Sequence, residues 1–286
     1  MKLPVTSYGD TGTPVVVMHG LFGSGRNWMT AARRLADKHR VFAFDLRNHG
    51  TSPHVDTMSY PEMADDVRET IESLGVGPVA LVGHSMGGKT AMLAALRDPD
   101  MVERLVVVDI APVSYPPHHL GMARAMRALD LTGIKRRGEA DAAPVDYPPA
   151  FVEYAQAMRN ADLSSVTRRA EVDAQLADAV PTPGTRAFLL QNLILDSDGA
   201  RWRPNLPVIE AALPAISGWP AVEGLHYDGP TLFIYGGKSD YVQQDHRVTI
   251  ATYFPHVQYA EVPEAGHWVH AERLDDFLAA LTPFLP

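Results

Sequence analysis

Continuous apolar runs alternate with helix-like stretches through the first part of the chain, and this alternation constrains the fold more than any other feature. Residues 28–36 and 60–74 read as amphipathic helices between such runs. A strand that is buried on both faces carries an unbroken apolar run, which is typical of a parallel sheet covered by helices. We therefore predict an α/β fold with a mostly parallel central sheet flanked by helices. Its first strands are expected at residues 14–18, 41–46, 79–82 and 105–110.

The end of the chain resumes this pattern, whereas the middle does not. Strand-like runs at 231–235 and 257–262 precede a closing helix at 273–282. The middle is helical or loop-like, and because it starts at a strand's carboxyl end, where open α/β sheets bind ligands, we predict a lid. The expected domains are a core of residues 1–114 and 228–286 and a mainly helical lid of residues 115–227. Helix-like pieces of the lid are residues 121–129, 151–159, 170–179 and 186–195.

Charge and composition exclude several classes of function. The net charge of -9 and the lack of a long Lys/Arg run argue against a nucleic-acid partner. Without cysteine, the chain has neither a thiol nucleophile nor a thiolate metal site. No apolar run approaches the roughly 20 residues that span a bilayer, and the first residues lack a signal-peptide core. We expect a cytoplasmic protein, and the sequence does not predict its oligomeric state.

A glycine-rich turn, Gly83-His84-Ser85-Met86-Gly87, matches the pattern G-x-S-x-G. It follows an apolar strand and precedes a helix-like stretch, which is the context that this motif requires. The turn is so sharp that only glycines leave room beside the serine. It also raises the Ser85 hydroxyl to a helix N-terminus, where developing negative charge is favoured. Ser85 is therefore the candidate nucleophile.

The order of residues along the chain indicates the partners of this serine. Nucleophile, acid and histidine follow one another in hydrolases built on such a turn, and His267 lies on a loop after the last strand. His267 is the candidate general base. Asp109 and Asp240 both stand at the carboxyl ends of strands, so either could orient the imidazole. Spacing slightly favours Asp240, because the acid often follows the penultimate strand.

The loop after the first long strand, His19 to Gly23, can turn a backbone N–H towards the serine. We expect the backbone amides of Leu21 and Met86 to form an oxyanion hole, which binds charge that exists only in the tetrahedral intermediate. The side chain of His19 is interpreted as structural. Acyl transfer by these groups requires no metal and no organic cofactor. The candidate substrate-binding residues are Phe22, Trp28 and Trp268.

Together these segments resemble the YbfF-type esterases of the α/β-hydrolase superfamily and their mitochondrial relatives. The resemblance implies Asp109 as the acid and moves our choice to it, with Asp240 as the alternative. It also implies a small-molecule substrate, a short-chain acyl ester or an acyl thioester. Competing hypotheses are a cofactor-free perhydrolase, a C–C bond hydrolase on the same triad, and a non-catalytic ligand-binding receptor. The matching motifs are residues 19–24, 45–50, 83–89, 108–113 and 265–271.

Overall fold

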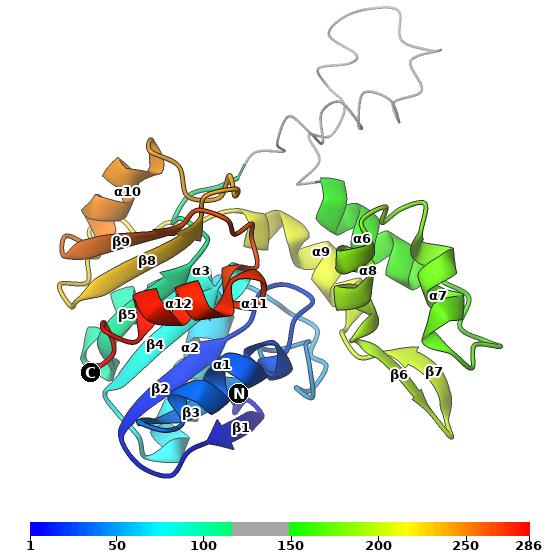
Figure 1. Cartoon of the computed structure of the whole chain (residues 1–286), viewed down its shortest axis with the longest axis horizontal. Coiled ribbons are helices and arrows are strands. Elements are labelled where there is room, and N and C mark those ends of the chain that lie inside the picture. Colours follow the sequence, from blue (N-terminus) through cyan, green and yellow to red (C-terminus); the bar gives the residue numbers. More distant parts are fainter. Residues whose placement is uncertain (116–148) are drawn as a thin grey trace, which may run out of the picture. The chain divides into compact units, whose positions relative to one another are not determined.

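The computed structural model describes residues 1–115 and 149–286 (Figure 1). The chain divides into two compact units. The first comprises residues 1–113, 203–205 and 219–286, and the second comprises residues 206–218 with the described residues between 114 and 202. The expected role of the inserted segment as a lid stays a prediction. Within the described ranges, no helix is both long enough and apolar enough to cross a membrane.

The first unit contains a seven-stranded sheet in the order β1-β3-β2-β4-β5-β8-β9. β1 is antiparallel to β3, and every other neighbouring pair is parallel. This confirms the mostly parallel sheet, since the apolar runs identified in the sequence form its buried central strands. The strands are β1 (Val5–Tyr8), β2 (Thr13–Met18), β3 (His39–Phe44), β4 (Val79–His84), β5 (Val102–Val108), β8 (Thr231–Gly236) and β9 (Val257–Val262).

Helices cover both faces of this sheet, as Figure 1 shows. α1 and α12 pack on the face that carries Val106 and Val108. α3 packs on the opposite face, where Gly88 lies against Val107. The helices of the first unit are α1 (Met29–Leu35), α2 (Tyr60–Leu74), α3 (Met86–Arg97), α10 (His246–Tyr253), α11 (Val269–Glu272) and α12 (Leu274–Leu281), with short 3₁₀ turns at Gly25–Trp28 and Pro99–Met101.

The limits of α2 follow from its local sequence. The Ser59 hydroxyl accepts a hydrogen bond from the Glu62 N–H, which satisfies one free donor of the first turn. Gly75 ends the helix in the left-handed region at φ 64°, where glycine is least strained. The predicted helix 60–74 is thus confirmed at both ends.

The second unit shows one wrong prediction. The helix expected at 186–195 ends at Leu190, and the next residues form a β-hairpin. Ser197 and Asp198 form its turn, and Gly199, the first residue of β7, has φ 103°, a conformation that favours glycine. The helix-like piece 121–129 lies outside the described residues. The elements of this unit are α6 (Pro149–Asn160), α7 (Arg169–Leu176), α8 (Pro183–Leu190), β6 (Leu193–Asp196), β7 (Gly199–Trp202) and α9 (Leu206–Ser217).

Candidate active site

Ser85 occupies a strained turn between β4 and α3. Its backbone has φ 53° and ψ −118°, which a residue with a side chain rarely adopts. The neighbouring backbone holds it there, because the Ser85 N–H donates to the Val108 carbonyl at 3.0 Å and the Ser85 carbonyl accepts from the Lys89 N–H at 3.0 Å. Strain of this kind persists only where the surroundings enforce it, and it clusters at functional sites.

The glycines beside Ser85 are sterically required. A Cβ atom on Gly83 would lie 2.1 Å from the Gly87 carbonyl oxygen, and one on Gly87 would lie 2.5 Å from the His19 carbonyl oxygen. Neither side chain could be accommodated without moving backbone. The structure therefore gives the steric reason for the motif that the sequence analysis singled out.

Asp109 lies at the end of β5, with its side chain completely buried. Its Oδ1 accepts a hydrogen bond from the Gly236 N–H at 2.9 Å, and its Oδ2 accepts one from His267 Nδ1 at 2.7 Å. The Ser239 hydroxyl also donates to Oδ2. Because the carboxylate requires a proton on Nδ1, the His267 ring presents its other nitrogen, Nε2, as a base.

The structure brings Asp109, and not Asp240, to His267. The Asp240 side chain is exposed, and its backbone carbonyl accepts from the Gln243 side chain at 3.1 Å; among the described residues the Asp240 carboxylate has no hydrogen-bond partner. The residue before it, Ser239, turns inwards to the Asp109 carboxylate instead. The loop after β8 thus contributes a hydroxyl to the site, where the spacing argument had favoured a second acid.

Three further groups hold the loop that carries His267. The His84 Nε2 donates to the His267 carbonyl at 2.9 Å. The Glu272 carboxylate accepts from the Gly266 N–H at 2.6 Å, next to the histidine. Tyr241 stacks on the imidazole, with ring centroids 4.2 Å apart and planes 27° apart. Sequence reasoning missed Ser239, Tyr241 and Glu272, because their roles arise only when distant loops meet.

The Ser85 hydroxyl makes no hydrogen bond to the His267 ring in this structure. The two residues nevertheless belong to one cluster, since the ring of His84, which precedes Ser85, lies 4.7 Å from the His267 ring. Serine–histidine hydrogen bonds are often long without substrate and tighten when it binds.

The expected oxyanion donors lie beside the same serine. A Cβ atom on Gly20 would lie 3.1 Å from the Ser85 Cβ, so the loop with Leu21 is in close contact with the turn. Met86 begins α3, and a first-turn N–H has no acceptor within its own helix. Among the residues that the structure describes, neither the Leu21 N–H nor the Met86 N–H donates to a backbone carbonyl.

The three aromatic residues proposed to bind substrate lie in different surroundings. Trp28 is completely buried in the core, where it stacks on His270 at a centroid distance of 4.3 Å. This position removes it as a candidate for substrate contact. Phe22 is 1% exposed and is therefore as inaccessible to solvent as Trp28, although its backbone, at φ 57°, follows Leu21 directly. Trp268 is partly exposed and meets the His267 ring edge-on at 5.8 Å, so it remains a candidate.

His270 predicts how stability depends on pH. Burial, with a smaller contribution from His267, lowers the pKa of this histidine to about 3. Between about pH 3 and pH 6.5 the unfolded chain therefore binds the proton more tightly, so acid lowers the free energy of unfolding. On going from pH 7 to pH 5 we expect this residue to cost about 2 kcal/mol.

Urea unfolding of the natural protein and of His270→Phe tests this expectation. The Nδ1 atom of His270 has no hydrogen-bond partner among the described residues, so its loss leaves no neighbouring polar group without a partner. Phenylalanine can also retain the stacking on Trp28. The variant is expected to lose less stability on acidification. Equal losses of unfolding free energy in the two proteins would show that His270 is not the cause, because the other buried histidines are common to both.

Comparison with known proteins identifies the family. A family model described as "alpha/beta hydrolase fold" matches residues 13–274. The chain is 42% identical to the sn-1-specific diacylglycerol lipase ABHD11 of Mus musculus, over 97% of this chain and 82% of the relative. It is 34% identical to Esterase YbfF of Escherichia coli, over 96% of this chain and 93% of the relative. A solved marine microorganism esterase is 33% identical and superposes with a TM-score of 0.86, over 99% of each chain. This chain therefore belongs to the α/β hydrolase fold family.

Proposed function

We propose that this protein hydrolyses carboxylic esters through an acyl-enzyme formed on Ser85. The observation that carries the proposal is the 2.7 Å hydrogen bond between Asp109 Oδ2 and His267 Nδ1, on a loop tied to the turn that bears Ser85. It supports an oriented imidazole on a loop that His84, the neighbour of Ser85, contacts, and an oriented imidazole with a serine at a helix N-terminus is the combination that activates a hydroxyl.

The relatives support an ester as substrate. Their names are esterase and sn-1-specific diacylglycerol lipase, and both denote hydrolysis of carboxylic esters. The chain spans most of the length of each relative. We therefore propose acyl esters as the substrate class, with short acyl chains and acyl thioesters as the finer proposals.

Acylation begins with proton transfer from Ser85 Oγ to His267 Nε2 as Oγ attacks the acyl carbonyl carbon. The carbonyl π electrons move to oxygen, and the resulting oxyanion accepts hydrogen bonds from the N–H groups of Leu21 and Met86. Asp109 stabilises the imidazolium through Nδ1. When the carbon–oxygen bond to the leaving alcohol breaks, the alcohol leaves with the proton from Nε2.

Deacylation repeats these steps with water. His267 Nε2 removes a proton from the water, the hydroxide adds to the acyl carbon, and the second oxyanion binds the same two N–H groups. Its collapse breaks the bond to Ser85 Oγ, which recovers its proton from the imidazolium. One ester and one water thus become one acid and one alcohol.

A substrate panel tests the proposal. Purified protein is assayed with p-nitrophenyl esters and acyl-CoAs of graded chain length and with a diacylglycerol. We expect turnover of the esters, fastest at short chain length, and labelling by a fluorophosphonate probe. A folded protein that turns over none of these substrates and resists the probe would refute an ester hydrolase. Faster turnover of long acyl chains would overturn only the preference for short ones.

Ser239 supports the acid in this mechanism. Its hydroxyl donates to the Oδ2 atom that also binds His267, so Ser239→Ala removes one of the donors to a buried carboxylate. The carboxylate is then oriented less firmly towards His267, and we expect kcat to fall about tenfold. Ser73→Ala is the matched control, because the Ser73 hydroxyl bonds to the Thr70 carbonyl within α2, and its kcat should not change. An unaltered kcat in Ser239→Ala would contradict the role.

A further inference from the structure

The His19 side chain is completely buried between two loops, and each of its nitrogens has a defined partner. The Nδ1 atom lies 2.8 Å from the Gly20 carbonyl oxygen, which can only accept. The Nε2 atom lies 3.0 Å from the Leu46 N–H, which can only donate. Both bonds form together only when the ring is neutral and its proton is on Nδ1. Burial favours the neutral ring, because it lowers the pKa of His19 by more than the nearby Asp45 raises it.

The bond to Gly20 has a consequence for the next N–H group. The Gly20 carbonyl also accepts from the Gly23 N–H at 3.0 Å, so two donors hold its direction. The peptide unit between Gly20 and Leu21 is planar and trans, and its N–H therefore points opposite to its C=O. Holding the Gly20 carbonyl thus orients the Leu21 N–H, the proposed oxyanion donor.

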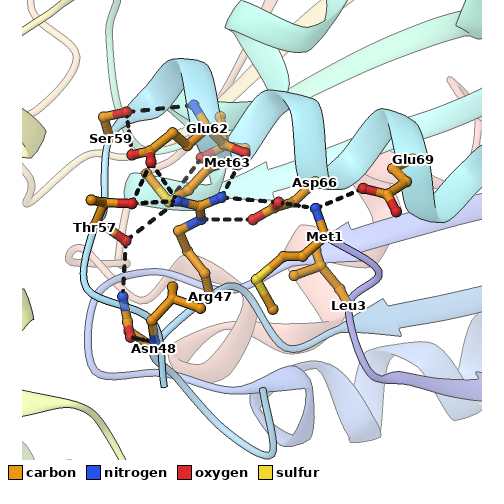
Figure 2. Close-up of polar contacts among 12 residues, drawn as sticks. Met1, Leu3, Arg47, Asn48, Thr57, Ser59, Glu62, Met63, Asp66 and Glu69 are labelled. Atoms are coloured by element: carbon orange, nitrogen blue, oxygen red, sulfur yellow. Dashed lines mark hydrogen bonds and ion pairs between the residues drawn. The ribbon is translucent and has the colours of Figure 1, made fainter. Parts of the chain in front are cut away.

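The loop on the other side of His19 is itself firmly anchored. Figure 2 shows the Arg47 guanidinium between carboxylates of α2, where Nε donates to Asp66 Oδ2 at 2.7 Å and a terminal nitrogen lies 3.0 Å from Glu62. Asp66 and the Arg47 side chain are buried, so this bidentate pair is shielded from solvent. Leu46 directly precedes Arg47, so the N–H that donates to His19 Nε2 belongs to this anchored loop.

We infer that His19 is a positioning residue, which aims the Leu21 N–H at the oxyanion through its bond to the Gly20 carbonyl. The inference rests on the proposed function and extends it, because it assigns a role to a side chain that never touches substrate.

Two substitutions separate the two bonds of His19. In His19→Asn the amide NH₂ can occupy the place of Nδ1 and keep the bond to Gly20, while the acceptor for Leu46 is lost. In His19→Gln the amide oxygen can occupy the place of Nε2 and keep the bond to Leu46, while the donor to Gly20 is lost. Asparagine is smaller than glutamine by one methylene and leaves the larger cavity, so a loss confined to His19→Gln reports the bond to Gly20 and not the loss of packing.

Only His19→Gln is expected to lose activity. The loss should affect stabilisation of the transition state and not substrate binding. Loss of one oxyanion donor lowers kcat by about 10²–10³-fold, and a donor that is only misaligned should cost about 10- to 100-fold in kcat with KM unchanged. A trifluoromethyl ketone, whose carbonyl carbon bonds to Ser85 Oγ and whose oxygen becomes an oxyanion, should bind to His19→Gln more weakly by the same factor. His19→Asn should retain most of the natural kcat and most of the natural affinity for the ketone. His39→Gln is the control, because that buried histidine, at the start of β3, bonds to Thr13, at the start of β2, and the substitution should alter neither value.

The outcomes separate the inference from the function on which it rests. If His19→Gln keeps the kcat and the inhibitor affinity of the natural protein, or if Asn and Gln lose equally, the inference is overturned while Ser85→Ala still abolishes turnover. If the natural protein neither hydrolyses esters nor binds the ketone, the proposed function fails, and the inference fails with it. A measurement without turnover adds a further check, in case a variant does not fold. The ¹⁵N shifts of the His19 ring should show a protonated Nδ1 and a bare Nε2 from pH 8 to pH 5, and the opposite tautomer would refute the inference.

Discussion

Ser85→Ala is expected to lower kcat for ester hydrolysis by about 10⁶-fold, to the background of the assay. Alanine removes the hydroxyl that the strained turn carries at the start of α3, so no acyl-enzyme can form on residue 85. The loss should appear in kcat measured with a p-nitrophenyl ester. Labelling by a fluorophosphonate probe should disappear in parallel, since both reactions require the same nucleophile.

The fold of this variant should be intact. The turn is held by backbone hydrogen bonds of Ser85 to Val108 and Lys89, and alanine retains both. A circular dichroism spectrum and an unfolding midpoint close to those of the natural protein would confirm this. Retained turnover or retained labelling in Ser85→Ala would identify a different nucleophile and remove the basis of the proposed mechanism.

Asp109→Asn is expected to lower kcat by about 10⁴-fold, whereas Asp240→Asn should leave it nearly unchanged. Asparagine preserves the shape of the buried side chain, but it cannot stabilise the imidazolium and it favours the wrong tautomer of His267. Asp240 is exposed and its side chain has no part in the cluster, so its charge is screened by water. Measuring kcat for both variants on one ester decides between the two aspartates.

The opposite ranking would overturn the choice of acid. A larger loss in Asp240→Asn would mean that the loop after β8 rearranges so that the Asp240 carboxylate, and not that of Asp109, accepts from His267 Nδ1. Equal and small losses would instead show that the Asp109–His267 bond contributes little to turnover. In that case the 2.7 Å contact would be structural, and the base would need another partner.

Much of this architecture could be predicted from the chain because its signals are local. The apolar runs became β2 to β5, β8 and β9, since strands buried on both faces need unbroken apolar sequence. The capping residues Ser59 and Gly75 marked the ends of α2. The glycines around Ser85 identified the turn, because no other residue fits a space of that size. Each of these features depends on residues that are adjacent in the sequence.

The remaining features depend on residues that are far apart in the sequence. Ser239 and not Asp240 turns towards Asp109, and that choice follows from the course of one loop over the ends of two neighbouring strands. Trp28 was a reasonable pocket candidate until the fold placed it against His270 in the core. His19 likewise acquires a partner only where the loop at Leu46 meets it. Local sequence specifies backbone geometry, but the pairing of side chains from separate loops is determined only when the whole sheet has assembled around them.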